Sequence, residues 1–503
     1  MGPVAESEAG VGGERARLVA TGLAAGVLLT ASLPPFGWWP LALAGAAVLA
    51  AALRGQPWSR RLLAGFAAGL GLFGPGLWWM TEFSAPGYVA ATIVEAAILA
   101  VVMVAVPPGT GRFVAFPVAL VLAGAAAGHW PFGGLPLASI PLGQADGPLA
   151  PAARLGGHLL LTALVGMVGA SLAAVGERAK TRSCAGRRVM ERVPVGAVAG
   201  LLAVAVVAVG GAAAPDGTAR GSLEVAAVQG GGARGLRAVS ADAGGVLDAH
   251  VAATDGVRRP VDLVLWPEDV VDVDAPLAGS AEETEVSDLA RRLGGTLVAG
   301  IVEDTEPGRF RNAAVAWAPD GSQVARYDKV HRVPFGEYIP FRSLVDRVAD
   351  ISAVPRDARA GDGPGILVTP AGPLGVVISY EVFFADRARA AVRAGGRVLL
   401  VPTNASSFTT SQVPAQELAA ARLRALETGR TVVQAAPTGF TAVVDPRGRV
   451  VAVTDLGPAA VVERRVTLRS GETLATRLGD APPTVVALTA LLAAIFLPGR
   501  KKT

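Results

Sequence analysis

The sequence predicts a polytopic α-helical membrane bundle of about eight spans joined to one mixed α/β domain, layered as helix, sheet, sheet and helix. Three observations support this prediction. The chain is 51% hydrophobic and only 17% charged, whereas soluble domains carry about 25% charged residues. Apolar runs long enough to cross ~30 Å of hydrocarbon follow one another from Leu18. One long central segment instead alternates short strand patterns with helix patterns.

Composition also excludes several classes of function. The formal net charge is only +4, and the basic residues flank apolar runs, which is typical of membrane topology rather than of nucleic-acid binding. The single cysteine, Cys184, excludes an internal disulfide framework and a multi-cysteine metal site. The four histidines show no metal-ligand spacing. We therefore expect no metal, no cofactor and no nucleic-acid partner.

The chain opens with a Gly-rich, acidic segment, residues 1–17, that we expect to be disordered. Eight apolar segments are then expected to span the membrane: 18–33, 38–53, 62–80, 88–106, 113–129, 155–175, 194–213 and 482–498. Pro34, Pro35 and Gly37 break the first two spans into a hairpin. We expect no cleaved signal peptide, because no small-residue cleavage site precedes the second span.

The positions of Lys and Arg predict the orientation of these spans. Basic residues occupy alternate links and the C-terminal tail: Arg54, Arg60, Arg61, Arg112, Arg178, Lys180, Arg182, Arg187, Arg188, Arg192, Arg500, Lys501 and Lys502. The links between them (34–37, 81–87 and 130–153) contain neither Lys nor Arg. Both termini are therefore expected in the cytoplasm. The predicted domains are a seven-span bundle (18–213), an extracytoplasmic domain (214–481), and a last span with its basic tail (482–503).

The extracytoplasmic segment has the pattern of a single α/β domain of about 250 residues. Strand patterns occupy 223–229, 262–268, 296–302, 312–318, 374–379 and 397–404. Helix patterns occupy 280–293, which opens with Ser280 and Glu283 in capping-box spacing, and 413–430. Turn sequences at 319–321 and 445–448 predict hairpins.

Reactive side chains follow several of these strands. Glu268 ends one strand, Lys329 and Glu337 follow another, and Ser379 ends the buried run 374–378. Taken singly, each residue is explained as a solvated loop charge, a turn residue or a strand-end hydroxyl. Their joint occurrence at strand ends favours a catalytic group made of a carboxylate, an amine and a nucleophile.

Five motifs in this order resemble those of the nitrilase superfamily: WPE (266–268), KVHRVPFGEYIP (329–340), SYE (379–381), PTNASSF (402–408) and RLRALETGR (422–430). The predicted spans, with PPFGWWPLAL (34–43) and GQADGPLA (143–150), make the chain similar to one membrane branch of that superfamily, the bacterial apolipoprotein N-acyltransferases. The resemblance covers essentially the whole chain. It implies a nitrilase-like fold for the extracytoplasmic domain.

The resemblance also implies a reaction and roles for these residues. An acyl chain passes from a phospholipid to the enzyme, and then to the N-terminal diacylglyceryl-cysteine amine of an apolipoprotein. Glu268 is then the general base, Lys329 stabilises the oxyanion, and position 379 carries the nucleophile. Glu337 and Glu381 are expected to orient Lys329 and the acceptor amine, and Tyr380 to line the pocket. We expect a monomer.

One residue departs from the family pattern. The family has cysteine where this chain has Ser379, and a hydroxyl is a weak nucleophile without strong activation. Three interpretations stay open: a replacement that halts turnover, a paralogue with weak or no activity, and a serine acyl-enzyme. We favour either of the first two over the third. Cys184 is expected on the cytoplasmic side, so it cannot replace the missing thiol.

Two alternative functions follow from that departure. A non-catalytic paralogue that binds lipid or lipoprotein is the main rival to an acyltransferase. An amidase acting on a small soluble substrate is disfavoured, because it has no use for eight spans. Glu95, in the middle of the fourth predicted span, is a further functional candidate or a packed acid. The segments 231–245 and 341–365 are candidate lid loops.

Overall fold

The computed structural model describes residues 3–82, 84–109, 111–185, 195–233, 242–347, 351–352, 354–409 and 411–496, with no side-chain description for 3–11, 179–185 and 407. The chain divides into two compact units: one comprises Met1–Ala214 with Leu478–Thr503, and the other comprises Pro215–Arg477. Several of the residues on which the sequence predictions rest lie outside the described residues: Arg187, Arg188, Arg192, Arg500, Lys501, Lys502 and most of the candidate lid 231–245.

The first unit is helical. Its long helices are α1 (Pro3–Ala31), α2 (Pro40–Ala52), α3 (Trp58–Gly76), α4 (Ala85–Val104), α5 (Arg112–Ala127), α6 (Ala153–Ala185), α7 (Val195–Ala213) and α14 (Ala481–Phe496). Short 3₁₀ turns lie between them: η1 (Trp78–Glu82), η2 (Ile140–Gln144) and η3 (Ala150–Ala152). Each of the eight predicted spans overlaps one of the long helices.

Small residues allow these helices to pack closely. A Cβ atom on Gly26 of α1 would lie 2.1 Å from the carbonyl oxygen of Ala68 on α3. A Cβ on Gly69 of α3 would lie 2.4 Å from Cα of Ala96 on α4. Close backbone approach through small residues is typical of helix packing in membranes, where lipid supplies no hydrophobic drive for association.

Within the part of the chain that the structure describes, three helical segments are long and apolar enough to cross a membrane: Ala85–Val104, Ala150–Arg178 and Val195–Ala213. Three shorter apolar helices accompany them: Pro40–Ala52, Arg112–Ala127 and Ala481–Phe496. Apolar helices of this kind fit a membrane protein. The number of helices that cross the membrane stays a prediction.

The N-terminal segment differs from expectation. α1 begins at Pro3, so residues 3–17, for which the sequence predicts disorder, are helical in the structure. Adding residues to an existing helix gives one hydrogen bond per residue without a new nucleation step. The apolar part of α1 can therefore extend the helix into a polar sequence.

The second unit is a four-layered α/β sandwich. Its strands are β1 (Thr218–Gln229), β2 (Leu263–Leu265), β3 (Val271–Val273), β4 (Thr296–Glu306), β5 (Arg309–Trp317), β6 (Gln323–Asp328), β7 (Asp357–Ala358), β8 (Ile366–Thr369), β9 (Gly372–Val376), β10 (Leu399–Pro402), β11 (Val432–Ala435), β12 (Ala442–Val444), β13 (Val450–Val453) and β14 (Ala460–Ser470). Its helices and 3₁₀ turns are α8 (Ala243–Thr254), α9 (Ala281–Leu293), α10 (Arg342–Val345), η5 (Ser379–Phe383), α11 (Ala385–Arg393), η6 (Ser406–Phe408), α12 (Val413–Thr428) and α13 (Leu474–Leu478).

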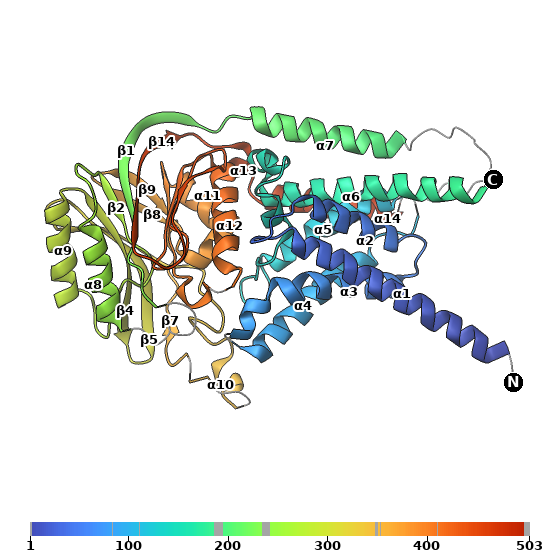
Figure 1. Cartoon of the computed structure of the whole chain (residues 1–503), viewed down its shortest axis with the longest axis horizontal. Helices are drawn as coiled ribbons and strands as arrows, with labels where there is room; N and C mark the ends of the chain where they lie inside the picture. The colour runs from blue at the N-terminus through green and yellow to red at the C-terminus, as the bar shows by residue number, and fades with distance from the viewer. Residues whose placement is uncertain are drawn as a thin grey trace. The chain divides into compact units, whose positions relative to one another are not determined.

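Two mixed sheets form the centre of the sandwich. The first has the order β14-β1-β2-β4-β5-β6, with β3 beside β4 and β7 beside β5; the second has the order β13-β12-β11-β10-β9-β8. In each sheet three neighbouring strands run parallel: β1, β2 and β4 in one, and β9, β10 and β11 in the other. Figure 1 shows α8 and α9 beside one sheet, with α11 and α12 beside the other.

The two sheets pack face to face through a buried apolar core. Side chains from the first sheet, such as Leu265 and Val298, share this core with Val376 and Leu400 from the second. A second core lies between the first sheet and its helices. There Ser280 caps α9 by accepting a hydrogen bond from the backbone N–H of Glu283 at 3.0 Å, at the predicted capping-box position.

One strand ends earlier than its apolar run predicts. The sequence predicts a strand over 374–379, whereas β9 ends at Val376 and Ser379 opens the 3₁₀ turn η5 with a φ of 46°. A left-handed backbone is uncommon for serine. The reactive hydroxyl is therefore presented from a tight turn just past the strand, not from the strand itself.

Candidate active site

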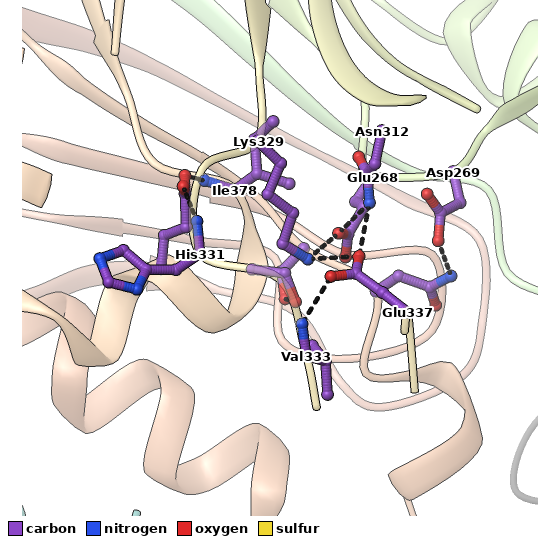
Figure 2. Close-up of polar contacts among 12 residues, drawn as sticks. Glu268, Asp269, Asn312, Lys329, His331, Val333, Glu337 and Ile378 are labelled. Carbon is purple, nitrogen blue, oxygen red and sulfur yellow. Dashed lines mark hydrogen bonds and ion pairs between the residues drawn. The ribbon is translucent and has the colours of Figure 1, made fainter. Parts of the chain in front are cut away.

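Lys329 lies between two carboxylates in the interior of the α/β unit. Its Nζ atom donates hydrogen bonds to Oε1 of Glu268 at 2.7 Å and to Oε1 of Glu337 at 2.8 Å. Asn312 donates from Nδ2 to the same two oxygens, at 2.8 and 2.9 Å. Figure 2 shows the four side chains converging on one point. We call Glu268, Asn312, Lys329 and Glu337 the ion-pair centre.

Strand ends position the first members of the ion-pair centre. Glu268 follows β2, and the Pro267 carbonyl ahead of it accepts from the N–H of Gly300 on β4 at 3.0 Å. A Cβ on Gly300 would lie 2.3 Å from that carbonyl oxygen and 2.4 Å from Cα of Glu268. Only glycine allows β4 to approach the Glu268 backbone this closely, so Gly300 fixes where the carboxylate begins.

Asn312 and Lys329 are tied to each other by the backbone. Lys329 directly follows β6, and its N–H donates to the carbonyl of Asn312 on β5 at 2.9 Å. Both side chains are buried, at 3% and 2% exposure. Asn312 was not among the predicted site residues; its signal in the sequence is one amide at the start of the apolar run 312–318.

Glu337 reaches the centre from a tight turn. Its second oxygen, Oε2, accepts from the N–H of Val333 at 2.7 Å, and its own N–H donates back to the Val333 carbonyl at 2.8 Å. These bonds close a loop around the carboxylate and leave Oε1 for Lys329 and Asn312. Glu337 therefore contacts Lys329 directly, as its expected orienting role requires.

Glu381 makes different contacts from Glu337. Its carboxylate accepts from the backbone N–H groups of Val330, His331 and Ile378 and from the hydroxyl of Tyr327 at 2.8 to 3.0 Å. It is fully buried. Glu381 thus fastens the turn that carries the nucleophile position to the segment just after Lys329. Its expected role toward the acceptor amine stays a prediction.

Ser379 lies against a second buried polar group. Its Oγ lies 3.4 Å from Oε1 of Glu417 and 3.1 Å from the Thr403 hydroxyl, and that hydroxyl lies 2.7 Å from Glu417 Oε1. We call Ser379, Thr403 and Glu417 the hydroxyl cluster. Thr403 directly follows β10 and Glu417 lies in the first turns of α12. The three side chains are 8%, 0% and 4% exposed.

Glu417 belongs to the same charged region as Lys329. The charges of Glu268 and Lys329 both act on its carboxylate, so the hydroxyl cluster and the ion-pair centre are electrostatic neighbours. Among the described residues, the hydrogen bonds found for Ser379 go to Glu417 and Thr403, not to Glu268. Catalytic hydrogen bonds often tighten only when substrate binds, so the predicted role of Glu268 stays a prediction.

Burial and neighbouring charges set the protonation of the ion-pair centre. Burial opposes the charge on Lys329, but Glu268 and Glu337 outweigh it and raise the pKa of the amine. Burial also raises the pKa of Glu268, with Lys329 opposing that shift and Glu337 adding to it. Lys329 is therefore a fixed cation held in a dry site, which is the environment in which a charge stabilises an oxyanion best.

Two further carboxyl groups flank the centre. Burial, and then the charge on Glu268, raise the pKa of Asp269 well above its usual range; Asn404 donates to this side chain at 3.2 Å. Burial raises the pKa of Glu417 to about 7, and the hydrogen bond from Thr403 opposes that rise. Neither Asp269 nor Glu417 was among the predicted site residues, because nothing in the sequence separates them from ordinary loop and helix carboxylates.

The arrangement suits acyl transfer. It joins a hydroxyl at a strained turn, carboxylates able to accept a proton, and a cation able to face a developing negative charge. Tyr380, expected to line the pocket, is 7% exposed and packs edge-on against Phe384 with 5.1 Å between ring centres. Within the described residues, no group of three or more His, Cys, Asp or Glu side chains could hold a metal ion.

Two family models match the chain. The carbon-nitrogen hydrolase model matches residues 224–475, which include the ion-pair centre and the hydroxyl cluster. The model of the apolipoprotein N-acyltransferase N-terminal domain matches residues 25–171. The two matches fall in different units of the structure and together cover most of the chain.

Individual relatives agree with the family models. An apolipoprotein N-acyltransferase of Geobacter metallireducens is 35% identical over 227 residues, 44% of this chain and 43% of the relative. The match to one from Mycolicibacterium smegmatis likewise covers 46% of that relative, at 31% identity and 52% of this chain. A third, from Bradyrhizobium diazoefficiens, is 28% identical over 94% of each chain.

Among solved structures, Saccharomyces cerevisiae Nit3, from branch 10 of the nitrilase superfamily, matches with 20% identity and a TM-score of 0.39, covering 57% of this chain and 98% of that one. The first two curated matches span less than half the length of those relatives. Because both family models match and one relative matches along nearly the whole chain, this protein belongs to the apolipoprotein N-acyltransferase family of carbon-nitrogen hydrolases.

Proposed function

We propose that this chain moves an acyl chain from a phospholipid to the N-terminal diacylglyceryl-cysteine amine of an apolipoprotein. The acyl group rests on Ser379 between the two half-reactions. The observation that carries this proposal is the convergence of Glu268 and Glu337 on Lys329 beside Ser379 and its hydroxyl cluster. The relatives named apolipoprotein N-acyltransferase support the choice of substrates.

Ser379 stands where the family has cysteine, and we propose that it makes this form slower than its thiol counterpart. A thiol is partly ionised near neutral pH and intrinsically more nucleophilic than a hydroxyl. Ser379→Cys should therefore raise the rate of transfer. Equal rates for the two forms would contradict this part of the proposal.

The experiment that tests the function uses the full chain in detergent with a phospholipid whose acyl chain is labelled and a synthetic diacylated lipopeptide. The account predicts a triacylated lipopeptide that carries the label, formed by the serine form and faster by Ser379→Cys. Replacement of the lipopeptide by its Nα-acetylated form should abolish transfer, because no free amine remains.

A second candidate function is a non-catalytic protein that binds lipid or lipoprotein. The hydroxyl at position 379 is the observation that favours it. In that case neither the serine form nor Ser379→Cys would transfer label, while both would still retain the lipopeptide.

We further propose that the eight long helices of the first unit span the cytoplasmic membrane, with both termini inside and residues 214–481 outside. Alternate basic links support this orientation. Asp274 offers a test because its side chain is 99% exposed. In intact cells, a membrane-impermeant maleimide should label Asp274→Cys and leave Cys184 unlabelled; the reverse pattern would contradict the orientation.

A further inference from the structure

Ser379 has a carboxylate partner that is distinct from Glu268. Glu417 Oε1 lies 3.4 Å from Ser379 Oγ and 2.7 Å from the hydroxyl of Thr403. Thr403 has one hydroxyl hydrogen to donate, and the shorter distance favours Glu417 as its acceptor. The hydrogen of Ser379 is then directed to Glu417 itself, or to the Thr403 oxygen that leads to it.

The two candidate bases differ in what surrounds them. Burial raises the pKa of Glu268 as well. Its Oε1, however, already accepts from the ammonium of Lys329 and from the amide of Asn312, and the Lys329 charge opposes that rise. Glu417 accepts from hydroxyl groups alone among the hydrogen bonds found for it in the described structure. Its pKa of about 7 matches the requirement for a base that works near neutral pH.

We propose that Glu417 is the general base that activates Ser379, with Thr403 positioning the two groups. The inference rests on the acyl transfer proposed above and concerns its first proton. It makes the serine a working nucleophile in this chain: slower than a thiol, but not inert.

Ser379 Oγ bonds to the carbonyl carbon of the phospholipid ester, its proton passes to Glu417, and the carbonyl electron pair moves onto the oxygen that faces Lys329. When the carbonyl re-forms, the bond to the glycerol oxygen breaks, and this oxygen leaves with the proton from Glu417. The products are a lysophospholipid and acyl-Ser379, with Glu417 again ionised. The acceptor amine then attacks the acyl ester and gives up a proton through Glu417 to the departing Ser379 Oγ.

A fluorophosphonate with a long alkyl chain tests this inference without donor or acceptor lipid, because it reports only how reactive the serine hydroxyl is. The full chain in detergent is labelled at pH 7.5, and the rate is followed by intact mass and mapped by peptide. Labelling is expected on Ser379 and absent from Ser379→Ala. Glu417→Gln keeps the shape of the side chain and should slow labelling on the order of 100-fold.

Glu427→Gln is the matched control. Glu427 is a buried carboxylate on the same helix, but it pairs with Arg424 at 3.0 Å rather than with a hydroxyl near the site. Its variant should be labelled at a rate close to that of the unaltered chain. Absence of labelling on Ser379 in the unaltered chain, or a Glu417→Gln rate equal to it, would overturn the inference.

Thr403→Val supplies a second measurement should Glu417→Gln fold poorly. Removing the Thr403 hydroxyl removes a hydrogen bond that lowers the pKa of Glu417, so the pH at which labelling is half-maximal should rise. A merely structural role for Glu417 would leave that midpoint unchanged, and this result would also overturn the inference. Acyl transfer by Ser379→Cys tests the proposed function separately, because a thiol does not need this base.

Discussion

The ion-pair centre and the hydroxyl cluster are neighbouring parts of one site. They differ in the groups that stabilise their buried carboxylates. In the ion-pair centre two carboxylates share one cation and one amide, so each charge has a partner. In the hydroxyl cluster the hydrogen bonds found for the buried carboxylate within the described residues come from hydroxyl groups. The first arrangement keeps Lys329 as a fixed cation, whereas the second holds a carboxyl group that gains and loses a proton near neutral pH.

The difference indicates a division of labour. Lys329 is suited to face the developing oxyanion because its charge is held at all ordinary pH values. Glu417 is suited to exchange a proton because the free energies of its two forms are close near neutral pH. If Glu417 had a cationic partner as Glu268 has, the site would keep its charges but would lack a base for the Ser379 hydroxyl.

The largest expected effect comes from removing the shared cation. Lys329→Met leaves Glu268 and Glu337 buried without a counter-ion, which should cost about 3–5 kcal/mol of unfolding free energy and on the order of 10³-fold in transfer rate. Chemical denaturation and labelled-lipid transfer measure the two effects. Lys329→Arg, which keeps the charge, should lose activity but much less stability; equal stability losses would show that the charge is not what holds the centre together.

A backbone shift under the ion-pair centre should have the next largest effect. Gly300→Ala places a methyl group against Pro267 and Glu268, so the Glu268 backbone must move away from β4. A misplacement of about 1 Å can cost on the order of 100-fold in rate. Gly244→Ala, on α8 where the nearest atom is a side-chain oxygen 3.3 Å away, is the control and should leave transfer unchanged. Unaltered transfer by Gly300→Ala would contradict the positioning role of this glycine.

Weakening the link between the ion-pair centre and the hydroxyl cluster should have a smaller effect. Glu381→Gln turns an amide N–H₂ toward groups that already donate hydrogen, so at least one buried bond to a charged group is lost, at about 1.5–3 kcal/mol. Because Glu381 fastens the Ser379 turn to the segment after Lys329, the rate should fall along with stability. Exposed Glu306→Gln is the control. A stable variant with full activity would show that the ion-pair centre and the hydroxyl cluster are positioned independently of each other.

The smallest expected effect is the pH dependence of Ser379 modification, which reports on the hydroxyl cluster and not on the ion-pair centre. Burial favours the neutral form of Glu417 and raises its pKa to about 7, so the base is lost as pH falls through 7 rather than through the usual range for Glu. The rate of Ser379 modification should fall about tenfold per pH unit below that point, because only the ionised base contributes, and level off above it. A flat profile between pH 5.5 and 8 would contradict the comparison.

Much of this architecture could be predicted from the sequence, because it follows from periodicity and spacing. The apolar runs coincide with helices, and the strand pattern ahead of Glu268 contains β2, whereas none of the predicted strand ranges covers β6, the strand ahead of Lys329. Two strand ends and one turn thereby bring Glu268, Lys329 and Glu337 together. The left-handed turn at Ser379 could not be predicted, because serine carries no sequence preference for it.

Asn312 and Glu417 escaped prediction for physical reasons. Asn312 lies at the point of β5 where two arginines give way to an apolar run, and its role depends on which strand lies next to it. Glu417 lies near the start of a helix, where any carboxylate is favoured by the helix dipole. α12 is buried on nearly every side, so periodicity could not show which face meets the Ser379 turn. Long-range packing, not local sequence, assigns both residues to the site.

The most direct test of the whole account is the mass of the chain after incubation with a phospholipid and no acceptor. The account predicts an increase equal to one acyl chain, mapped by peptide analysis to Ser379 and removed when the diacylated lipopeptide is added. An unchanged mass for both the serine form and Ser379→Cys, or an adduct on another residue, would contradict it.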